Sequence, residues 1–464
     1  MSIPTYRRPS RPLSLALVAM TILVVLAPAF LAAQAAPTAG LKESVGHIVV
    51  IYQENWSFDS LYGRFPGANG IANASVDSLT QRAKDGSLLA AAPTPLANGK
   101  PDPAFASADL AGLRKPYDLS AYVKPEALTG DIVHRFYTNQ LQIDGGKNDK
   151  FVTWSDNGGL VMSYFDATTM PEGILAQEYV LLDNFFQAAF GGSFLNHQWL
   201  IAAASPRFPN APAGMIATPP DAQGLTVADK VVTPDGYAVN TSFSVNQPHP
   251  ANIDPTTLVP NQTGPTIGDR LSEKGVSWAW YSGGWNDAVA GHPDPLFQFH
   301  HQAFAYFANY ADGTPGRKEH LKDEADFLAA VDSGDFPAVS FIKPLGPDNE
   351  HPGYASLMRG QQHVADLVRR IRNSPAWKDT VIIITYDEFG GRWDHVTPPT
   401  VDRWGPGTRI PAIVVSPFAK MGTIDHTQYD TTSILKFIED RYDLKPLSDR
   451  DANAASLVNA LNLR

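Results

Sequence analysis

Short apolar runs recur along the chain and predict strands that are buried on both faces of a sheet. Residues 47–52 read HIVVIY, and residues 380–386 read TVIIITY, the clearest run in the chain. Continuous rather than alternating apolarity is typical of a strand whose two faces are both covered. Shorter runs of the same kind occupy residues 178–183, 276–281, 338–342 and 410–415.

Helical patterns alternate with these runs through the second half of the chain. Over residues 354–372, apolar side chains recur at three- and four-residue steps, which predicts an amphipathic helix. Further helices are expected at residues 194–204, 270–274, 319–332 and 431–442, the last with Asp430 as its N-cap. Strands and helices in alternation imply a parallel sheet that is covered by helices on both faces.

Two long segments lack these patterns. Residues 66–130 are rich in Ala, Pro, Gly, Asn and Asp, and residues 206–265 are dense in Pro, Asn and Thr. Such composition is typical of loops outside a sheet. We therefore expect residues 37–464 to form one large domain with two long insertions.

The N-terminal segment has the features of a secretory signal peptide. Arg7, Arg8 and Arg11 precede a nearly continuous apolar stretch at residues 13–26, and a small-residue tract follows at residues 32–36. We predict a signal over residues 1–36, export to the periplasm or medium, and no membrane span after cleavage. The alternative is an uncleaved anchor, because residues 13–33 are long enough to cross a bilayer.

Composition excludes several classes of function. The 464 residues include no cysteine, which rules out structural zinc modules of the thiolate type, Fe–S clusters, disulfide scaffolds and a cysteine nucleophile. With 36 Lys and Arg against 47 Asp and Glu, the net charge is −11. That acidity argues against a nucleic-acid partner, which would require basic surface.

Polar side chains follow two of the predicted strands. Glu54 and Asn55 come just after the first strand, and Asp387 and Glu388 follow the strand at residues 380–386. Ligands of open α/β sheets collect at the carboxyl ends of strands. Four oxygen donors without sulfur favour a hard divalent cation, or zinc if imidazole joins them. Each acid taken alone could instead be a helix N-cap or lie in a solvated turn.

A Gly-Gly-Ser turn at residues 191–193 follows another predicted strand and precedes a helix. Glycines permit a tight turn there, and the start of the helix offers free N–H groups to an anion. The Ser193 hydroxyl is a candidate nucleophile, with an ordinary N-cap serine as the alternative. The turn is not the G-x-S-x-G of α/β hydrolases, because Leu195 occupies the second glycine position.

Six of the 12 histidines lie in turns or at predicted strand ends: His134, His197, His300, His301, His351 and His395. The adjacent pair at 300–301 is unusual enough to suggest a site. Imidazoles can bind phosphoryl oxygens and protonate a leaving group near neutral or acidic pH. We assign the histidines at 249, 292, 320, 363 and 426 to structural or surface roles.

Taken together, these motifs resemble the bacterial phosphoesterase family of phospholipases C and acid phosphatases. Residues 47–63, HIVVIYQENWSFDSLYG, are similar to the family's opening motif, and residues 385–396, TYDEFGGRWDHV, to its second. Residues 409–417 are similar to the third motif, and residues 191–196 lie between. The resemblance covers most of residues 46–442.

Within that family, the chain is more similar to the acid phosphatase branch. Residues 65–70, FPGANG, and residues 143–149, IDGGKND, carry this likeness. In addition, Trp56 stands where the phospholipase C branch usually has arginine. The resemblance therefore puts acid phosphatase first and phospholipase C second.

The resemblance also implies a fold and a set of roles. The fold would be an alkaline-phosphatase-like α/β/α sandwich with long loop insertions. One divalent metal ion, either Ca, Mg, Mn or Zn, would be held by Glu54, Asn55, Ser193, Asp387 and Glu388. Ser193 would be the nucleophile, His301 and His351 further catalytic groups, and Asn55, His134 and His300 substrate-binding groups. His197 and His395 are carried over only weakly.

We therefore expect an exported, metal-dependent phosphatase that hydrolyses phosphate monoesters through a phosphoserine. Participation of an imidazolium, whose ordinary pKa is about 6.5, predicts an acidic pH optimum. Phospholipase C activity on phospholipid phosphodiesters is the alternative within enzymes. An exported protein that binds a metal ion or an anion without turnover is the alternative from another class.

Overall fold

The computed structural model describes residues 1–2, 4, 40–97, 99–106 and 115–463. The chain divides into Met1–Gln34 and Ala35–Arg464, and the description below concerns the second unit. The predicted signal at residues 1–36 lies outside the described residues, except at positions 1, 2 and 4. Among the described residues, no helix combines the length and the apolar character that crossing a bilayer requires.

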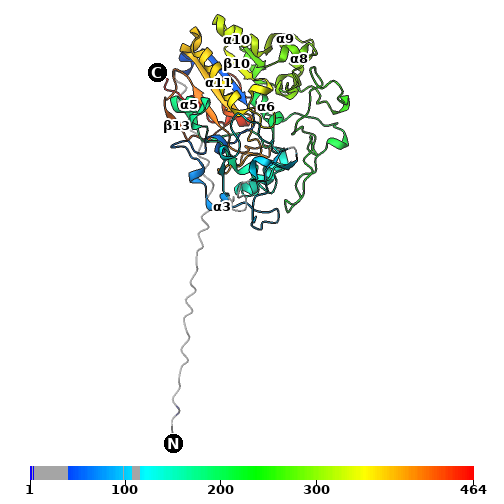
Figure 1. The fold of residues 1–464 in the computed structure, drawn as a ribbon, viewed down its shortest axis with the longest axis vertical. Helices are drawn as coiled ribbons and strands as arrows, with labels where there is room; N and C mark the ends of the chain where they lie inside the picture. The colour runs from blue at the N-terminus through cyan, green and yellow to red at the C-terminus, as the bar shows by residue number, and fades with distance from the viewer. Residues whose placement is uncertain (3, 5–39, 98, 107–114, 464) are drawn as a thin grey trace. The chain divides into compact units, whose positions relative to one another are not determined.

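An eight-stranded sheet forms the centre of the second unit (Figure 1). Its order is β13 (Thr423–Asp425), β6 (Val180–Leu182), β12 (Ala412–Val415), β11 (Thr380–Tyr386), β1 (His47–Gln53), β10 (Val339–Lys343), β8 (Trp278–Ser282) and β9 (Leu321–Asp323). Among these strands β12 alone runs antiparallel to its neighbours. The sheet therefore has the predicted strands, but one of them is reversed.

Helices pack against this sheet in two groups. α11 (Leu357–Arg372) contacts α5 (Pro171–Glu178) and α10 (Glu324–Ser333). In the other group, α12 (Thr432–Tyr442) contacts α1 (Leu41–Ser44) and α6 (Ser193–Ala202), and α6 contacts α7 (Ile267–Glu273). The strands β1, β10, β11 and β12 are buried along almost their whole length. Both faces of the sheet are covered, and the predicted α/β/α sandwich is confirmed.

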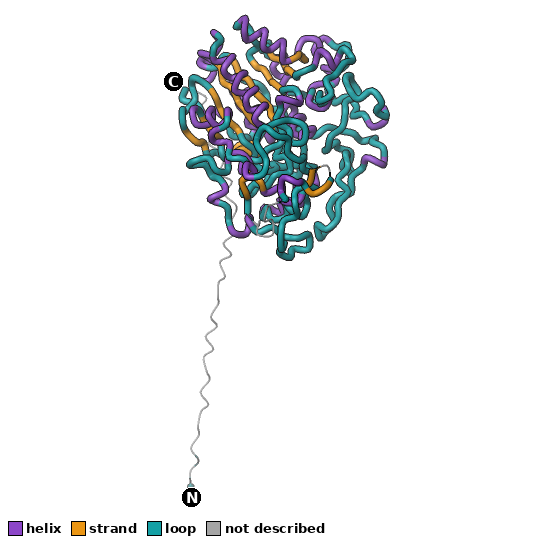
Figure 2. The backbone as a smooth tube through the Cα atoms, viewed as in Figure 1, coloured by secondary structure: helices purple, strands orange, loops and turns teal. Residues whose placement is uncertain are grey.

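The remaining short elements lie in the connections. They are α2 (Phe58–Tyr62), α3 (Val76–Leu79), α4 (Phe136–Ile143), α8 (Trp285–Val289), α9 (Pro315–His320), α13 (Asp449–Ala452), β2 (Leu96–Ala97), β3 (Lys100–Pro101), β4 (Tyr117–Asp118), β5 (Ser163–Tyr164), β7 (Phe185–Phe186) and β14 (Tyr429–Asp430). Within residues 66–130 and 206–265, no described segment joins the eight-stranded sheet. Figure 2 shows the long loops that result.

Two expectations from the sequence are corrected. The helix expected at residues 319–332 is divided, because β9 intervenes between α9 and α10. Asp323 ends this strand and caps α10, since its carboxylate accepts a hydrogen bond from the Ala325 N–H at 3.0 Å. The sheet is mixed rather than parallel, because β12 pairs antiparallel with β11. An antiparallel β12 enters the sheet at the edge where β11 ends, so the connection between them stays at that edge.

Strand register places the predicted polar residues at one level. β1 pairs in parallel with β11 from His47 opposite Thr380 to Gln53 opposite Tyr386. The next residues of the two strands are therefore Glu54 and Asp387. On its other side β1 pairs in parallel with β10. The carboxyl ends of the three central strands thus meet at one edge of the sheet.

Candidate active site

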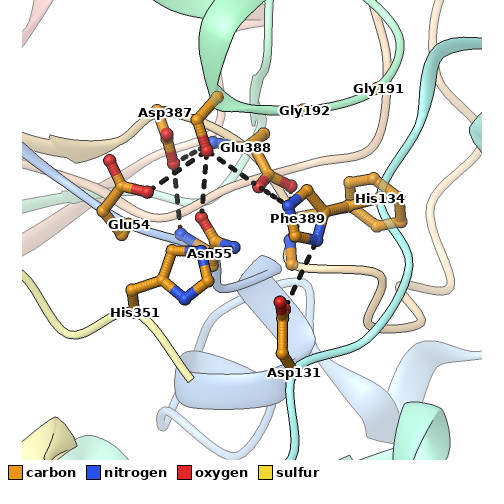
Figure 3. Close-up of polar contacts among 12 residues, drawn as sticks. Glu54, Asn55, Asp131, His134, Gly191, Gly192, His351, Asp387, Glu388 and Phe389 are labelled. Carbon is orange, nitrogen blue, oxygen red and sulfur yellow. Dashed lines mark hydrogen bonds and ion pairs between the residues drawn. The ribbon is translucent and has the colours of Figure 1, made fainter. Parts of the chain in front are cut away.

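Two pairs of polar side chains lie together at this edge (Figure 3). Glu54, Asn55, Asp387 and Glu388 are all fully buried. The Asn55 backbone N–H donates a hydrogen bond to Asp387 Oδ1 at 3.1 Å, which ties one pair to the other. These four residues are called the ligand set below. The structure therefore brings together the oxygen donors that the sequence places at two strand ends.

The backbone of Asn55 is held in an uncommon conformation. Its φ is 66°, in the left-handed region, where asparagine is better tolerated than most residues. Gly390 packs against it: a Cβ at Gly390 would lie 2.0 Å from the Asn55 carbonyl oxygen. Only glycine fits at that position. The Gly390 contact thus helps to fix the direction of the Asn55 side chain.

Ser193 faces the ligand set from the first residue of α6. Its Oγ lies 3.2 Å from Glu54 Oε2, 3.4 Å from Asn55 Oδ1 and 3.4 Å from Glu388 Oε1. Gly192 is the N-cap of α6, so Ser193 is not the capping residue of the alternative interpretation. The hydroxyl lies where the N–H groups and the positive end of the helix dipole favour negative charge.

The turn before Ser193 depends on glycine. Gly191 has a φ of 88°, and a Cβ there would lie 2.6 Å from the Phe136 backbone nitrogen. A Cβ at Gly192 would lie 2.7 Å from the His134 carbonyl oxygen. The segment that carries His134 therefore packs directly on the Gly-Gly turn. This contact brings His134 next to the nucleophile candidate.

Negative charge is concentrated in the ligand set. Burial, and next the charge of Glu54, raise the pKa of Asp387 to about 7. Burial, and next the charge of Asp387, raise the pKa of Glu388 well above its ordinary value. Among the described residues, none donates a hydrogen bond to Asp387 Oδ2. A buried, all-oxygen donor set with an unpartnered carboxylate oxygen fits a hard divalent cation.

His134 and His351 border the ligand set on one side (Figure 3). The Asn55 side-chain amide donates to His351 Nε2 at 3.0 Å, and His134 Nε2 lies 3.6 Å from Glu388 Oε1. The Nδ1 of each ring is paired with a backbone carbonyl, at Ile132 and Pro352. Since a carbonyl accepts, Nδ1 carries the proton and Nε2 faces the site in the neutral ring.

A second group of histidines, His197, His300 and His301, adjoins Glu54 and Ser193. His301 Nε2 is 3.0 Å from Glu54 Oε1, and the His197 and His301 rings stack with centroids 4.9 Å apart. His197 Nδ1 lies 2.8 Å from the Ser193 carbonyl oxygen. The His300 ring contacts the His301 ring at a centroid distance of 4.5 Å. The structure therefore places His197, carried over only weakly from the resemblance, beside Ser193.

Burial favours the neutral form of these rings. It lowers the pKa of His300 to about 3 and the pKa of His301 well below its ordinary value, in both cases with a further contribution from the Lys343 charge. The pKa of His351 is lowered mainly by burial. Neutral rings at neutral pH weigh against the predicted donation of a proton by an imidazolium.

His395 belongs to a different cluster. Its Nδ1 lies 2.6 Å from Asp59 Oδ2, and its Nε2 lies 3.2 Å from the Asn69 side-chain oxygen. The buried Arg409 guanidinium binds Asp59 at 3.0 Å and Asp394 at 3.1 Å. These contacts join the opening motif to the second and third motifs. The cluster therefore ties the loops of the three motifs together, and among the described residues no hydrogen bond or ion pair joins it to the ligand set.

Two charged residues near the site escape prediction from the sequence. Lys343 is 1% exposed, forms an ion pair with Glu54 Oε1 and donates to the Tyr52 carbonyl at 3.0 Å. Asp131 lies 3.7 Å from His134 Nδ1. A signal for Lys343 exists, since it directly follows the strand predicted at residues 338–342, and the structure makes it the last residue of β10. Asp131 lies in a loop, where no periodicity marks it.

A cavity of about 270 Å³ lies beside the Gly-Gly turn that precedes Ser193. Its walls include His134 and Gly192, the residue before Ser193. Other wall residues are mostly polar or charged: Asp131, Arg135, Asp156, Asn240 and Thr241. A group in this cavity would therefore contact mostly polar walls that include His134 and Gly192.

Comparison with known proteins gives relatives that cover most of the chain. Phospholipase C B of Mycobacterium tuberculosis (strain ATCC 25618 / H37Rv) is 25% identical over 92% of this chain and 80% of its own length. Phospholipase C A of the same strain is 26% identical over 92% of this chain and 79% of its own length. A solved protein of the alkaline phosphatase superfamily from Vibrio parahaemolyticus matches with a TM-score of 0.36 and 11% identity, over 63% of this chain and 64% of its own.

The sequence model of the Phosphoesterase family matches residues 45–445. This range contains both predicted pairs of oxygen donors, the Gly-Gly-Ser turn and all six histidines that the sequence singles out. It also includes every strand of the eight-stranded sheet. The chain belongs to the phosphoesterase family.

Proposed function

We propose that this protein is a metal-dependent phosphoesterase of the phospholipase C type, with Ser193 as its nucleophile. The observation that carries the chemistry is the position of Ser193 Oγ within 3.2–3.4 Å of three side chains of the ligand set. The phospholipase C names of relatives that align with 92% of the chain support a phosphodiester substrate. They favour this alternative over the acid phosphatase that the sequence motifs put first.

The ligand set and Ser193 would hold one divalent cation. When bound, such a cation lowers the pKa of a coordinated hydroxyl and offsets charge on phosphoryl oxygens. Glu54 and Glu388 offer carboxylate oxygens at 3.2 and 3.4 Å to take the Ser193 proton. Both are fully buried and held in place, so the hydroxyl is oriented before substrate arrives.

The reaction would proceed in two displacements at phosphorus. Ser193 Oγ passes its proton to a ligand-set carboxylate and forms a bond to phosphorus, while the bond to the leaving alkoxide breaks and the alkoxide takes up that proton. Water then attacks the phosphoserine and passes a proton to the same carboxylate, the bond from phosphorus to Oγ breaks, and Oγ takes the proton back. N–H groups at the start of α6 lie where they can donate hydrogen bonds to the equatorial oxygens. The rings of His134 and His351, whose Nδ1 atoms are bonded to carbonyls, would donate from Nε2 only when protonated.

Hydrolysis of phosphate monoesters is the second candidate. The cavity walls are mostly polar, which suits a small phosphate ester as well as a lipid headgroup. Trp56 supports the same candidate, because the resemblance gives arginine there in the phospholipase C branch. The Trp56 indole donates to the Glu350 carbonyl at 3.1 Å, and the Arg392 guanidinium lies 4.0 Å from its ring centroid. A guanidinium is therefore present beside this position, supplied by another residue.

Turnover of three substrates by one preparation separates the candidates. The substrates are p-nitrophenyl phosphate, bis(p-nitrophenyl) phosphate and phosphatidylcholine vesicles, each with added Ca²⁺, Mg²⁺, Mn²⁺ or Zn²⁺. Faster hydrolysis of both diesters supports the phospholipase C type, and faster hydrolysis of the monoester supports the phosphatase. Metal binding without turnover of any substrate would favour the non-catalytic alternative.

Substitution tests the nucleophile. We expect Ser193→Ala to lower kcat at least 1,000-fold, the order seen when a catalytic nucleophile is removed. The control is Ser333→Ala, an exposed serine of α10, which should keep wild-type activity. A Ser193→Ala variant within tenfold of wild type would exclude the phosphoserine route.

A further inference from the structure

A second group of possible metal ligands, formed by the buried side chains of Glu54, His197 and His301, adjoins the ligand set. One ligand atom from each of Glu54, His197 and His301 lies within 4.8 Å of the other two. Among the described residues, His197 Nε2 has no hydrogen-bond partner, while Glu54 Oε1 is paired with the Lys343 ammonium and lies 3.0 Å from His301 Nε2. All three side chains are at least nine-tenths buried. One carboxylate and two imidazoles form a donor set that binds zinc in proteins.

The geometry of His197 makes its Nε2 a free acceptor. Nδ1 lies 2.8 Å from the Ser193 carbonyl oxygen, which can only accept, so Nδ1 carries the proton. Nε2 then presents a lone pair with no donor. A hydrogen bond of this kind from Nδ1 to a carbonyl is also what orients histidine ligands of metal ions. A buried lone pair of this sort calls for a positive charge nearby.

Lys343 brings a positive charge to Glu54, the carboxylate of this group. Its Nζ pairs with Glu54 Oε1 and donates to the Tyr52 carbonyl at 3.0 Å. The side chain is fixed by its place at the end of β10 and is 1% exposed. Glu54 therefore bridges two positions: Oε2 turns to Ser193 and the first cation position, and Oε1 turns to the ammonium.

We propose that the Lys343 ammonium is a built-in second cation of this site, occupying a position that Glu54, His197 and His301 would otherwise offer to a divalent metal ion such as Zn²⁺. The inference rests on the proposed function, because Glu54 is shared with the first metal position. In the wild type the second charge needs no metal and does not depend on metal supply. Removal of the ammonium uncovers a His₂Glu site.

Metal content after equilibration with zinc tests this. Wild type and Lys343→Ala are incubated with Zn²⁺, desalted and measured by elemental analysis. We expect Lys343→Ala to hold one more zinc ion per chain than the wild type. The double variant Lys343→Ala/His197→Asn should return to the wild-type number. Lys343→Met, which keeps the space filled, should also stay at the wild-type number.

The quantity measured is the difference in zinc content between the variant and the wild type. It therefore does not depend on whether the ligand set holds a metal ion of its own. A wild type that binds no zinc would count against the proposed metal of the ligand set, yet the difference of one would still be expected. Equal zinc content in a folded Lys343→Ala protein would overturn the proposal, as would a wild type that gains zinc at His197. If circular dichroism shows that Lys343→Ala is unfolded, Lys343→Ser is measured in its place.

Discussion

Gly360, on α11, packs against the loop that carries His351. A Cβ at this position would lie 2.2 Å from Glu350 Cγ, 3.0 Å from the Glu350 backbone nitrogen and 3.2 Å from the Asp348 carbonyl oxygen. Carbon atoms in contact normally stand about 3.5–4.0 Å apart. Two of the three contacts are with backbone atoms. Gly360→Ala must therefore displace the loop rather than one flexible side chain.

That loop is tied to both halves of the ligand set through Glu350. The Glu350 carboxylate accepts hydrogen bonds from Gln53 Nε2 at 3.1 Å and from the Tyr386 hydroxyl at 2.7 Å. Gln53 and Tyr386 are the residues just before Glu54 and Asp387. Glu350 itself has a φ of 72°, and this left-handed conformation is held by the contacts around it. A shift of Glu350 therefore reaches His351 and both strand ends.

The expected change in stability has the opposite sign to that of an ordinary helix position. Gly→Ala inside an exposed helix stabilises by about 1 kcal/mol. Overpacking of a filled interior costs about 1–3 kcal/mol, so we expect Gly360→Ala to lower the free energy of unfolding by about 1–2 kcal/mol. A displacement of about 1 Å at catalytic groups lowers activity about 100-fold. We expect a loss of that order in kcat/KM.

The assay pairs urea unfolding with hydrolysis of bis(p-nitrophenyl) phosphate. Gly264→Ala is the control, because no atom lies within 4 Å of a Cβ there, and it should match the wild type. Glu350→Ala removes the Cγ that Gly360→Ala would strike. The double variant should therefore be less destabilised than the sum of the two single variants. Full additivity, or wild-type activity in Gly360→Ala, would refute the reasoning.

Three further perturbations have an expected direction of change in stability. Burial, and next the neighbouring Asp451, raise the pKa of Glu439 to about 9. The pKa of Glu439 is higher in the folded state than in the unfolded state, so the protein loses stability as the pH rises toward 9. The melting temperature of Glu439→Gln should therefore exceed that of the wild type at pH 8.5, and the two should differ less at pH 5. Arg409→Met leaves the buried carboxylates of Asp59 and Asp394 without their cationic partner, and should lower the free energy of unfolding in urea by about 3–5 kcal/mol. Arg369→Met, at an exposed ion pair, is the control and should lower it by less than about 1 kcal/mol. Chelation should lower the melting temperature more at pH 8 than at pH 5, because the ligand-set carboxylates must be ionised to bind metal; an equal shift at both pH values would count against that set.

The local pattern of apolar residues was sufficient to predict most strands of the sheet. The runs at residues 47–52 and 380–386 are unbroken β-branched and apolar sequence, and both became central strands. β9 escaped prediction because Leu321-Lys-Asp is too short to show a period beside helical neighbours. The direction of β12 is also absent from its sequence, since pairing partners and strand direction are set by the whole sheet. Long-range pairing, rather than propensity, decided both cases.

The same division holds for the site. Glu54 and Asp387 could be placed because parallel strands bring their carboxyl ends to one edge. Lys343 could not be placed in the site from the sequence, because a lysine at a strand end is more often solvated. It reaches Glu54 only because β10 lies beside β1 in the sheet. The partners of His197 and His395 depend on tertiary contacts with Ser193 and Asp59. Sequence therefore located donors, and the fold decided which donors meet.

The charge balance of the site links Lys343 to substrate choice. Three ligand-set carboxylates and the Lys343 ammonium leave two negative charges, which one divalent cation would neutralise. A phosphodiester, with one negative charge, then binds with less unbalanced charge than a phosphate monoester with two. Zinc in place of the ammonium adds one positive charge. Zinc-loaded Lys343→Ala should therefore hydrolyse bis(p-nitrophenyl) phosphate less well relative to p-nitrophenyl phosphate than the wild type does. An unchanged ratio in a variant that holds the extra zinc would show that this charge does not set the preference.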